Sequence, residues 1–181
     1  MPNSNKHRKL SFAECYVNQT ILYWLVPGRI PNHCEGTTKC LKEIEKNAHS
    51  RTRDYLLGLI DYEYNDGIRK YLDRVLNKHK CSIECENEII KIYQCENTIQ
   101  LLVFSKPPED LLADKDPYYR EFFRNAKNLR QFKRNARKYL DASNRDLCSN
   151  KNNIREHVLG GLCLLYSLTR ELVKNCVFSS K

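Results

Sequence analysis

The stretch 56-LLGLIDYEYNDG-67 begins as an apolar run and ends in three carboxylates. A short apolar run of this kind, bounded by turn residues, is typical of a strand buried on both faces of a parallel sheet. Asp61, Glu63 and Asp66 then fall at the carboxyl end of that strand. In open α/β sheets, ligands bind at the carboxyl ends of the strands. The stretch therefore predicts an α/β fold with a candidate site at one edge of its sheet.

Strand and helix patterns alternate on both sides of this stretch, up to about residue 106. Strands are predicted at 9–15, 54–63, 89–95 and 96–106, and helices at 16–26, 37–53 and 68–79. Pro107 and Pro108 end the last strand, because proline cannot donate to a sheet ladder. Only helical patterns follow, over 109–145 and 152–176. The alternation predicts a layered, mostly parallel sheet with flanking helices.

The chain is predicted to have two parts, an α/β domain over 1–112 and an all-helical subdomain over 113–181. Its 181 residues suit one domain with a small appendage, and a hydrophobic content of 41% allows a real core. The 31 Lys and Arg residues exceed the 22 Asp and Glu residues, giving a net charge of +9. This balance favours an anionic partner, nucleic acid before a membrane. A solvated basic surface is the alternative.

The ends of the chain and its cysteines bear on its compartment. Residues 1–9 are polar and basic with no apolar segment after them, and no run approaches the roughly 18 apolar residues of a membrane span. We therefore expect a soluble cytoplasmic protein whose cysteines are reduced thiols, because their number is odd. A zinc site is the alternative, although the usual short ligand spacings are absent. The nine cysteines are Cys15, Cys34, Cys40, Cys81, Cys85, Cys95, Cys148, Cys163 and Cys176.

A second carboxylate, Glu14, also follows a predicted strand. If the two strands are neighbours, Glu14 and Asp61 meet at the sheet edge, and Glu63 points the same way as Asp61 because it lies two residues on. These three carboxylates would supply the oxygen ligands that Mg²⁺ (or Mn²⁺) prefers, and Asp66 could assist through water. The alternative is a solvated loop with a helix cap, since Asp66-Gly67 is also an ordinary turn and helix-start sequence.

The order of these parts resembles the Toprim fold, the metal-binding domain of topoisomerases, bacterial primases and OLD-family nucleases. In that family a Glu follows the first strand and an Asp-x-Asp pair follows a later apolar strand. The matching stretches are AECYVN (13–18) and IDYEYND (60–66). Small stand-alone bacterial Toprim-like proteins, some of unknown function, also look similar at LLVFSKPPEDLL (101–112). The resemblance covers about residues 8–112.

Three residues depart from the family pattern. Cys15 replaces the usual Gly, Asn18 replaces an Asp, and Glu63 replaces the second acid of the Asp-x-Asp pair. The resemblance implies that Glu14 is a general acid/base or metal ligand and that Asp61 and Glu63 hold Mg²⁺. It implies a Mg²⁺-dependent nuclease or phosphoryl-transfer protein acting on nucleic acid, in defence or repair. The departures instead suit a catalytically inactive nucleic-acid-binding or assembly module.

Residues 118–140, YYREFFRNAKNLRQFKRNARKYL, are predicted to form a basic helix. An uncompensated cationic stripe of this kind is what a phosphate-tracking helix needs, although phosphate contacts do not specify DNA or RNA. An acidic protein partner or an acidic membrane is the alternative. The aromatic residues lie on the opposite, apolar face and are expected to pack against the sheet. The stripe consists of Arg120, Arg124, Lys127, Arg130, Arg134, Arg137 and Lys138.

The last helix, predicted over 154–176, is apolar enough to be buried in the helical subdomain or in a homodimer interface. Its Gly160-Gly161 pair costs helix stability, so we expect close packing there. Glu109 follows another predicted strand and could approach the acidic edge, although an acidic residue at a helix N-terminus is the simpler interpretation. No P-loop, dinucleotide, zincin or hydrolase motif occurs in the sequence.

Overall fold

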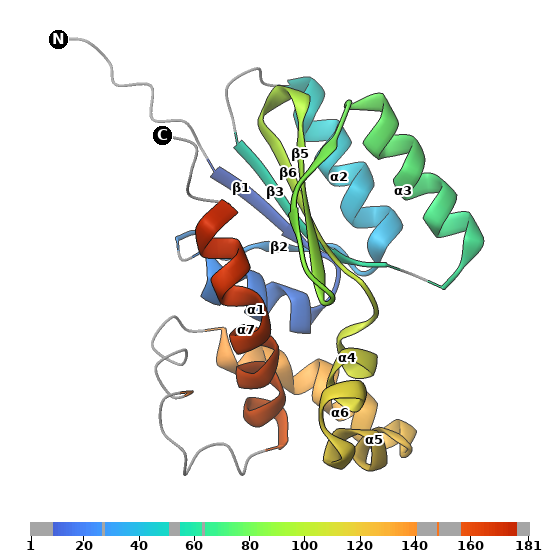
Figure 1. The fold of residues 1–181 in the computed structure, drawn as a ribbon, viewed down its shortest axis with the longest axis vertical. Coiled ribbons are helices and arrows are strands. Elements are labelled where there is room, and N and C mark those ends of the chain that lie inside the picture. The colour runs from blue at the N-terminus through green and yellow to red at the C-terminus, as the bar shows by residue number, and fades with distance from the viewer. Residues whose placement is uncertain are drawn as a thin grey trace, which may run out of the picture.

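The computed structural model describes residues 9–26, 28–50, 55–62, 64–140, 148 and 157–176. A six-stranded sheet with the order β2-β1-β3-β6-β5-β4 forms its centre (Figure 1). Strands β2, β1, β3 and β6 are parallel, and β5 and β4 run antiparallel to their neighbours. The predicted α/β class with a mostly parallel sheet is confirmed. The strands are β1 (Lys9–Ala13), β2 (Asn32–His33), β3 (Tyr55–Asp61), β4 (Ser82–Glu86), β5 (Ile90–Cys95) and β6 (Ile99–Phe104).

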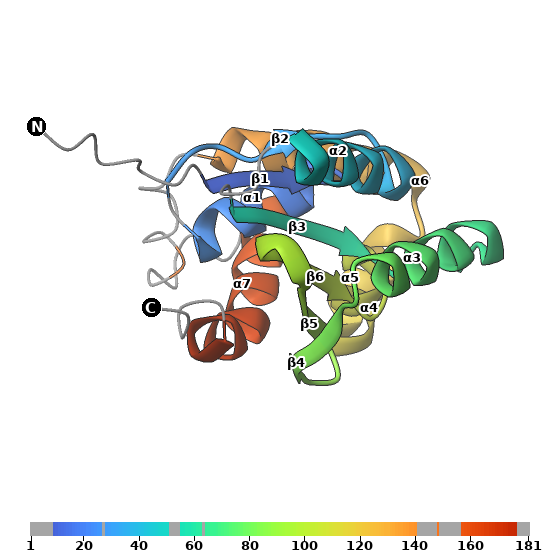
Figure 2. The ribbon, with the colours of Figure 1, turned by 90° about the horizontal axis from the view of Figure 1, so that it is seen from above.

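Helices cover both faces of the sheet. Helices α2 (Thr37–Ser50) and α3 (Asp66–Lys78) pack on one face, and α1 (Tyr16–Leu25) and α7 (His157–Cys176) pack on the other (Figures 1 and 2). Strand β3 is apolar at nearly every position because its side chains enter both cores in turn. Leu57 and Leu59 join the core under α1 and α7, while Leu56 and Ile60 join the core under α2 and α3.

Gly58 allows α2 to pack closely on β3. A Cβ atom at this position would lie 2.6 Å from Cδ1 of Ile44 and 2.9 Å from Cδ2 of Leu101. Both distances are shorter than a carbon–carbon contact allows, so a larger residue would force the ends of the Ile44 and Leu101 side chains to move.

The segment after β6 lies beyond the carboxyl edge of the parallel strands (Figure 1). The single basic helix predicted over 118–140 is wrong, because the structure divides it into two helices and a short 3₁₀ turn. Asn125 ends the first part: its side chain accepts a hydrogen bond from the Lys127 N–H and starts a new helix there. The elements are α4 (Pro108–Lys115), α5 (Pro117–Phe123), α6 (Ala126–Ala136) and η2 (Arg137–Tyr139).

The C-terminal helices share a core with the sheet. Phe132 of α6 and Leu162 of α7 belong to the same buried cluster as Phe104 of β6. A Cβ on Gly161 would lie 2.8 Å from Cε2 of Phe132, so the close packing expected at the glycine pair is present. Trp24 of α1 donates from Nε1 to the Tyr139 carbonyl oxygen at 2.9 Å. In the part of the chain that the structure describes, no helix combines the length and apolarity needed to cross a membrane.

Two features of the β4–β5 region differ from the sequence expectations. Strand β4 was not predicted, and the segment 96–106 begins with a 3₁₀ turn, η1 (Glu96–Thr98), before β6. Strand β4 is exposed at four of its five positions, so it lacks the alternation by which a half-buried strand is recognised. Its pairing with β5 is irregular between Ile83 and Cys85.

The expectation that all cysteines are reduced thiols is wrong for six of the nine. The structure contains disulfides Cys81–Cys95, Cys85–Cys176 and Cys148–Cys163, while Cys15, Cys34 and Cys40 are free. Cys81 and Cys95 face each other because β4 and β5 are antiparallel neighbours. Cys85 of β4 meets the last residue of α7, 91 residues away along the chain. These pairings arise from tertiary packing, which an odd cysteine count and linear spacings do not reveal.

Candidate functional site

Glu14 and Asp61 lie together at the carboxyl edge of the sheet. Strands β1 and β3 are neighbours, with Ala13 opposite Leu59, so the residues that follow them reach the same edge. Glu14 Oε2 accepts hydrogen bonds from the Asp61 backbone N–H at 2.9 Å and from Thr37 Oγ1 at 2.7 Å. Glu14 is only 7% exposed and Asp61 only 4%. Two carboxylates that are 47 residues apart in sequence therefore form one buried acidic pair.

Asn18 completes the surroundings of Asp61 from α1. Its Nδ2 donates to Asp61 Oδ1 at 2.8 Å, and the side chain of Asn18 is fully buried. Burial raises the pKa of Asp61 well above its usual value, and the charge of Glu14 raises it further, while the hydrogen bond from Asn18 opposes the rise. The pair is therefore expected to hold a proton in the absence of a bound cation.

Lys133 and Glu109 bring a second pair of charges to this edge. Lys133 of α6 forms an ion pair with Glu109 of α4, with 2.6 Å between Nζ and Oε1. Burial lowers the pKa of Lys133, but the hydrogen bond to Glu109 and the negative charges of Glu109 and Asp61 outweigh it, so the net shift is upward. The charges of Glu109 and Lys133 both act on Asp61, in opposite directions.

Lys133 is a site residue that the sequence does not single out. It follows Phe132 and precedes the basic stripe residue Arg134, so its position along the helix places it toward the apolar side. A lysine within an apolar stripe is the one feature that could have drawn attention to it. Glu109 lies in the first turn of α4, as the helix-start interpretation predicted, and it also approaches the acidic pair.

Two buried oxygen atoms near this pair have no hydrogen-bond partner among the residues that the structure describes. They are Oδ1 of Asn18, beside Asp61, and Oε2 of Glu109. Buried acceptors are usually satisfied, so both are positions at which a cation or a donor group would be stabilising. Carboxylate and amide oxygens are the ligands that Mg²⁺ and Mn²⁺ accept. The chemistry of the donor set therefore fits a hard divalent cation.

The acidic residues do not all gather at the pair. Within the described ranges, no three His, Cys, Asp or Glu side chains are grouped as a metal site. Glu63 lies outside the described residues. Asp66 is exposed as the first residue of α3 and forms an ion pair with Arg69, while Asn65 caps the helix by accepting from the Gly67 N–H at 2.9 Å. Asp66 thus occupies the turn and helix start that its sequence context also suggested.

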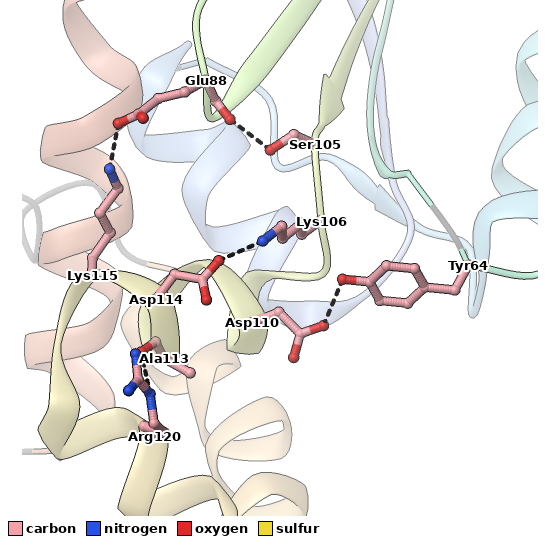
Figure 3. A network of polar contacts seen from close by, with 9 residues as sticks. All are labelled: Tyr64, Glu88, Ser105, Lys106, Asp110, Ala113, Asp114, Lys115 and Arg120. Atoms are coloured by element: carbon pink, nitrogen blue, oxygen red, sulfur yellow. Dashed lines mark hydrogen bonds and ion pairs between the residues drawn. The ribbon is translucent and has the colours of Figure 1, made fainter.

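The residues of the predicted basic stripe are exposed along α5, α6 and η2, but they differ in how they are engaged. Arg124 is paired with Glu121 at 2.6 Å, and Arg120 donates from Nε to the Ala113 carbonyl oxygen at 3.3 Å. Around α4 the lysines are also paired, as Figure 3 shows for Lys106 with Asp114 and for Lys115 with Glu88. Arg124 is the one stripe residue that forms an ion pair with the described part of the chain; the others are Arg120, Lys127, Arg130, Arg134, Arg137 and Lys138.

Arg137 connects this basic surface with aromatic residues at the sheet edge. Its guanidinium lies over the Tyr16 ring, 5.5 Å from the centroid. Tyr16 in turn stacks on His33, with 3.9 Å between ring centroids. Tyr16 begins α1, two residues after Glu14, and His33 pairs with Ala13, so both rings lie at the same edge of the sheet as the acidic pair.

Comparison of the chain with protein-family models, with curated proteins and with solved structures finds no match. The case for a function therefore rests on the side chains described above, and the Toprim resemblance remains a prediction.

Proposed function

We propose that the chain binds nucleic acid through the exposed basic face of α6 and acts on its phosphodiester backbone at the Glu14–Asp61 pair with the help of Mg²⁺ or Mn²⁺. The observation that carries this proposal is the double role of α6. The helix exposes Arg130 and Arg134 and also places Lys133 where its charge acts on Asp61. A polyanion held on the outer face of α6 would thus lie next to a buried acidic site.

The residues of the pair have distinct roles in this proposal. A bound divalent cation would polarise a phosphoryl oxygen and favour ionisation of a water molecule. Asp61 and the free oxygen of Asn18 would hold that cation, and Glu63 is expected to add a ligand, as the sequence suggests. Hydrogen bonds from Thr37 and from the Asp61 N–H orient the Glu14 carboxylate. In this proposal, Glu14 holds or moves a proton rather than binding the cation. Lys133 would offset negative charge on the phosphate.

The raised pKa of Asp61 gives this site a pH dependence. Because burial raises the pKa of Asp61, a cation that binds below that raised pKa must displace a proton from the carboxyl group. Cation affinity is therefore expected to increase with pH, until Asp61 is ionised without the metal.

A catalytically inactive nucleic-acid-binding or assembly module is the second candidate. The observation that favours it is the near-complete burial of both carboxylates and the use of Glu14 Oε2 by Thr37 and Asp61. On this reading, Glu14 joins α2 to β1 and β3 and does no chemistry. A protein that docks an acidic partner, or a second copy of the chain, through the basic helices remains a third prediction.

The experiment that separates these candidates measures binding and cleavage on the same samples. Labelled single-stranded and duplex DNA and RNA are incubated with the wild type, Asp61→Asn and Glu14→Gln, with Mg²⁺, Mn²⁺ or a chelator. Asp73→Asn, which changes an exposed carboxylate on α3, is the matched control. The proposal expects metal-dependent cleavage that Asp61→Asn and Glu14→Gln abolish while binding persists.

The other outcomes are equally distinct. Salt-sensitive binding by all four proteins with no cleavage would support the inactive module. An absence of binding even at low salt would overturn the nucleic-acid proposal altogether and leave a protein partner as the reading of the basic surface.

A further inference from the structure

A hollow of about 510 Å³ lies between α5 and the start of α7, and neither residue of the acidic pair lines it. Tyr118 and Tyr119 line it from α5, and His157, Gly160 and Leu164 line it from α7. The Tyr119 hydroxyl donates to the His157 carbonyl oxygen at 2.8 Å, which holds the start of α7 against α5. Sites for small molecules usually measure roughly 300–1,000 Å³, so the hollow is large enough for a small organic ligand.

The ring of Tyr118 gives this hollow an aromatic wall, and the residue is 44% exposed. The Tyr119 ring stands nearly perpendicular to it, at an interplanar angle of 81°. His157 and Phe122 lie nearly parallel to Tyr118, with ring centroids at 5.4 Å and 5.8 Å. Because His157 and Phe122 are only 5.0 Å from each other, they do not sandwich Tyr118 from opposite faces. Part of the Tyr118 ring therefore remains open to a ligand.

Asp116 gives the hollow a negative charge in a protein whose net charge is +9. Among the described residues that line the hollow, it is the one acidic side chain, and none is Lys or Arg. Burial raises the pKa of Tyr118 and the charge of Asp116 raises it further, and the same charge acts on Tyr119. A carboxylate beside aromatic rings attracts a cation and disfavours a phosphate group.

The hydroxyl groups around the hollow are already engaged in hydrogen bonds within the protein. The Tyr118 hydroxyl is bonded to Nδ1 of His157, and the Tyr119 hydroxyl donates to the His157 carbonyl oxygen. Ser167 Oγ donates to the Cys163 carbonyl oxygen at 2.8 Å. A nucleobase would need such groups for its polar edge. A quaternary ammonium ion carries no N–H group and is held by cation–π attraction, so it suits these surroundings better.

We propose that this hollow binds a small-molecule quaternary ammonium ion of the choline type. Its methyl groups contact the Tyr118 ring, and Asp116 compensates its charge. Leu164 and Gly160 provide an apolar surface for the substituent on the nitrogen. The proposal does not depend on the acidic pair or on nucleic-acid binding.

The test uses the full chain with its disulfides intact and choline as the probe, with binding followed by ligand-observed NMR and calorimetry. The comparison ligand is the neutral analogue in which carbon replaces the choline nitrogen. We expect choline to bind more tightly than this analogue. Tyr118→Leu should weaken choline binding roughly 2-fold to 30-fold, as expected for one lost cation–π contact, whereas Tyr118→Phe keeps the ring and should bind like the wild type.

Asp116→Asn removes the charge alone, because asparagine is an equally good helix cap and can still accept from the Tyr118 N–H. This variant should bind choline more weakly and melt like the wild type. The control Asp73→Asn, on the exposed face of α3, should bind choline unchanged.

Three results would overturn the proposal. Equal affinity for choline and its neutral analogue would mean that the hollow is only an apolar surface. Absence of choline binding would leave no ammonium site, and preferential binding of adenosine would make the hollow a nucleobase site instead. If Tyr118→Leu fails to fold, the comparison of the two ligands on the wild type decides, together with Asp116→Asn, whose unchanged affinity would also contradict the proposal.

Discussion

The disulfide between Cys85 and Cys176 makes a quantitative prediction, because it closes a long loop. It joins the exposed strand β4 to the last residue of α7, with a sequence separation of 91 residues. In the chain-entropy model, a cross-link of this length destabilises the unfolded state by about 4.6 kcal/mol, compared with about 3 kcal/mol for the 14-residue separation of Cys81–Cys95. Removing the longer link should therefore cost more stability.

The effect on the melting temperature follows from the length of the chain. An unfolding entropy of about 2.1 cal/mol/K per residue gives about 0.38 kcal/mol/K for 181 residues. The double variant Cys85→Ala with Cys176→Ala should then melt about 12 °C below the wild type, and the variant Cys81→Ala with Cys95→Ala about 8 °C below it.

Thermal unfolding by circular dichroism, without reductant, measures both shifts. The variant lacking Cys81–Cys95 serves as the control, because it also loses two sulfurs from the same sheet region. Alkylation and mass mapping of the wild type first establish that both bonds are formed. The reasoning is refuted if removal of the shorter link lowers the melting temperature as much as removal of the longer one, or if Cys85 and Cys176 are alkylated in the native wild type.

Three further predictions concern the acidic pair, the basic face and the packing of α7. Asp61→Asn should be more stable than the wild type at pH 7 and equal to it near pH 3. The pKa of Asp61 in the folded protein is raised above the ordinary 3.8, so the stability of the wild type is fully present below pH 3.8 and is lost as pH rises through the folded-state pKa. Urea unfolding at a series of pH values checks this, and a difference that grows toward low pH would contradict it. Arg134→Ala should weaken nucleic-acid binding and reduce the slope of log affinity against log salt by about 1, which a salt titration measures; an unchanged slope would remove Arg134 from the interface. Gly161→Ala should lower the free energy of unfolding by about 1–3 kcal/mol, because the new methyl group would meet Phe132, and a neutral result in urea unfolding would show that the ring moves aside.

The parts of the fold that the sequence predicted are those whose apolar residues form a continuous run or a regular period. Strand β3 was recognised because an apolar run ended at Gly and acidic residues, and the meeting of Glu14 with Asp61 followed from strand ends at one sheet edge. Strand β4 was not predicted because most of its side chains are exposed. The division between α5 and α6 was not predicted because a single asparagine cap interrupts an otherwise continuous amphipathic pattern.

The parts of the site that the sequence did not predict depend on tertiary contacts. Lys133 belongs to the site through an ion pair with Glu109, 24 residues earlier in the chain, and its place beside the apolar stripe of the helix does not by itself indicate that contact. The disulfides likewise depend on which strands and helices become neighbours. Asn18, first noted as a departure from a family pattern, proves to be the buried donor to Asp61, a contact that only the packing of α1 on the sheet reveals.

The burial of β3 on both faces has a consequence for how the strand finds its register. When one face of a strand is exposed to solvent, the pattern of apolar residues sets the register, because a slip of one residue would expose the apolar side chains. Residues 56–61 are all buried, so a slipped β3 would remain apolar on both faces. Only Gly58, which fits under Ile44, and Asp61, which meets Asn18, distinguish the correct alignment. The acidic pair therefore also marks the register of the central strand, and substitutions at Asp61 test the accuracy of folding together with the chemistry of the site.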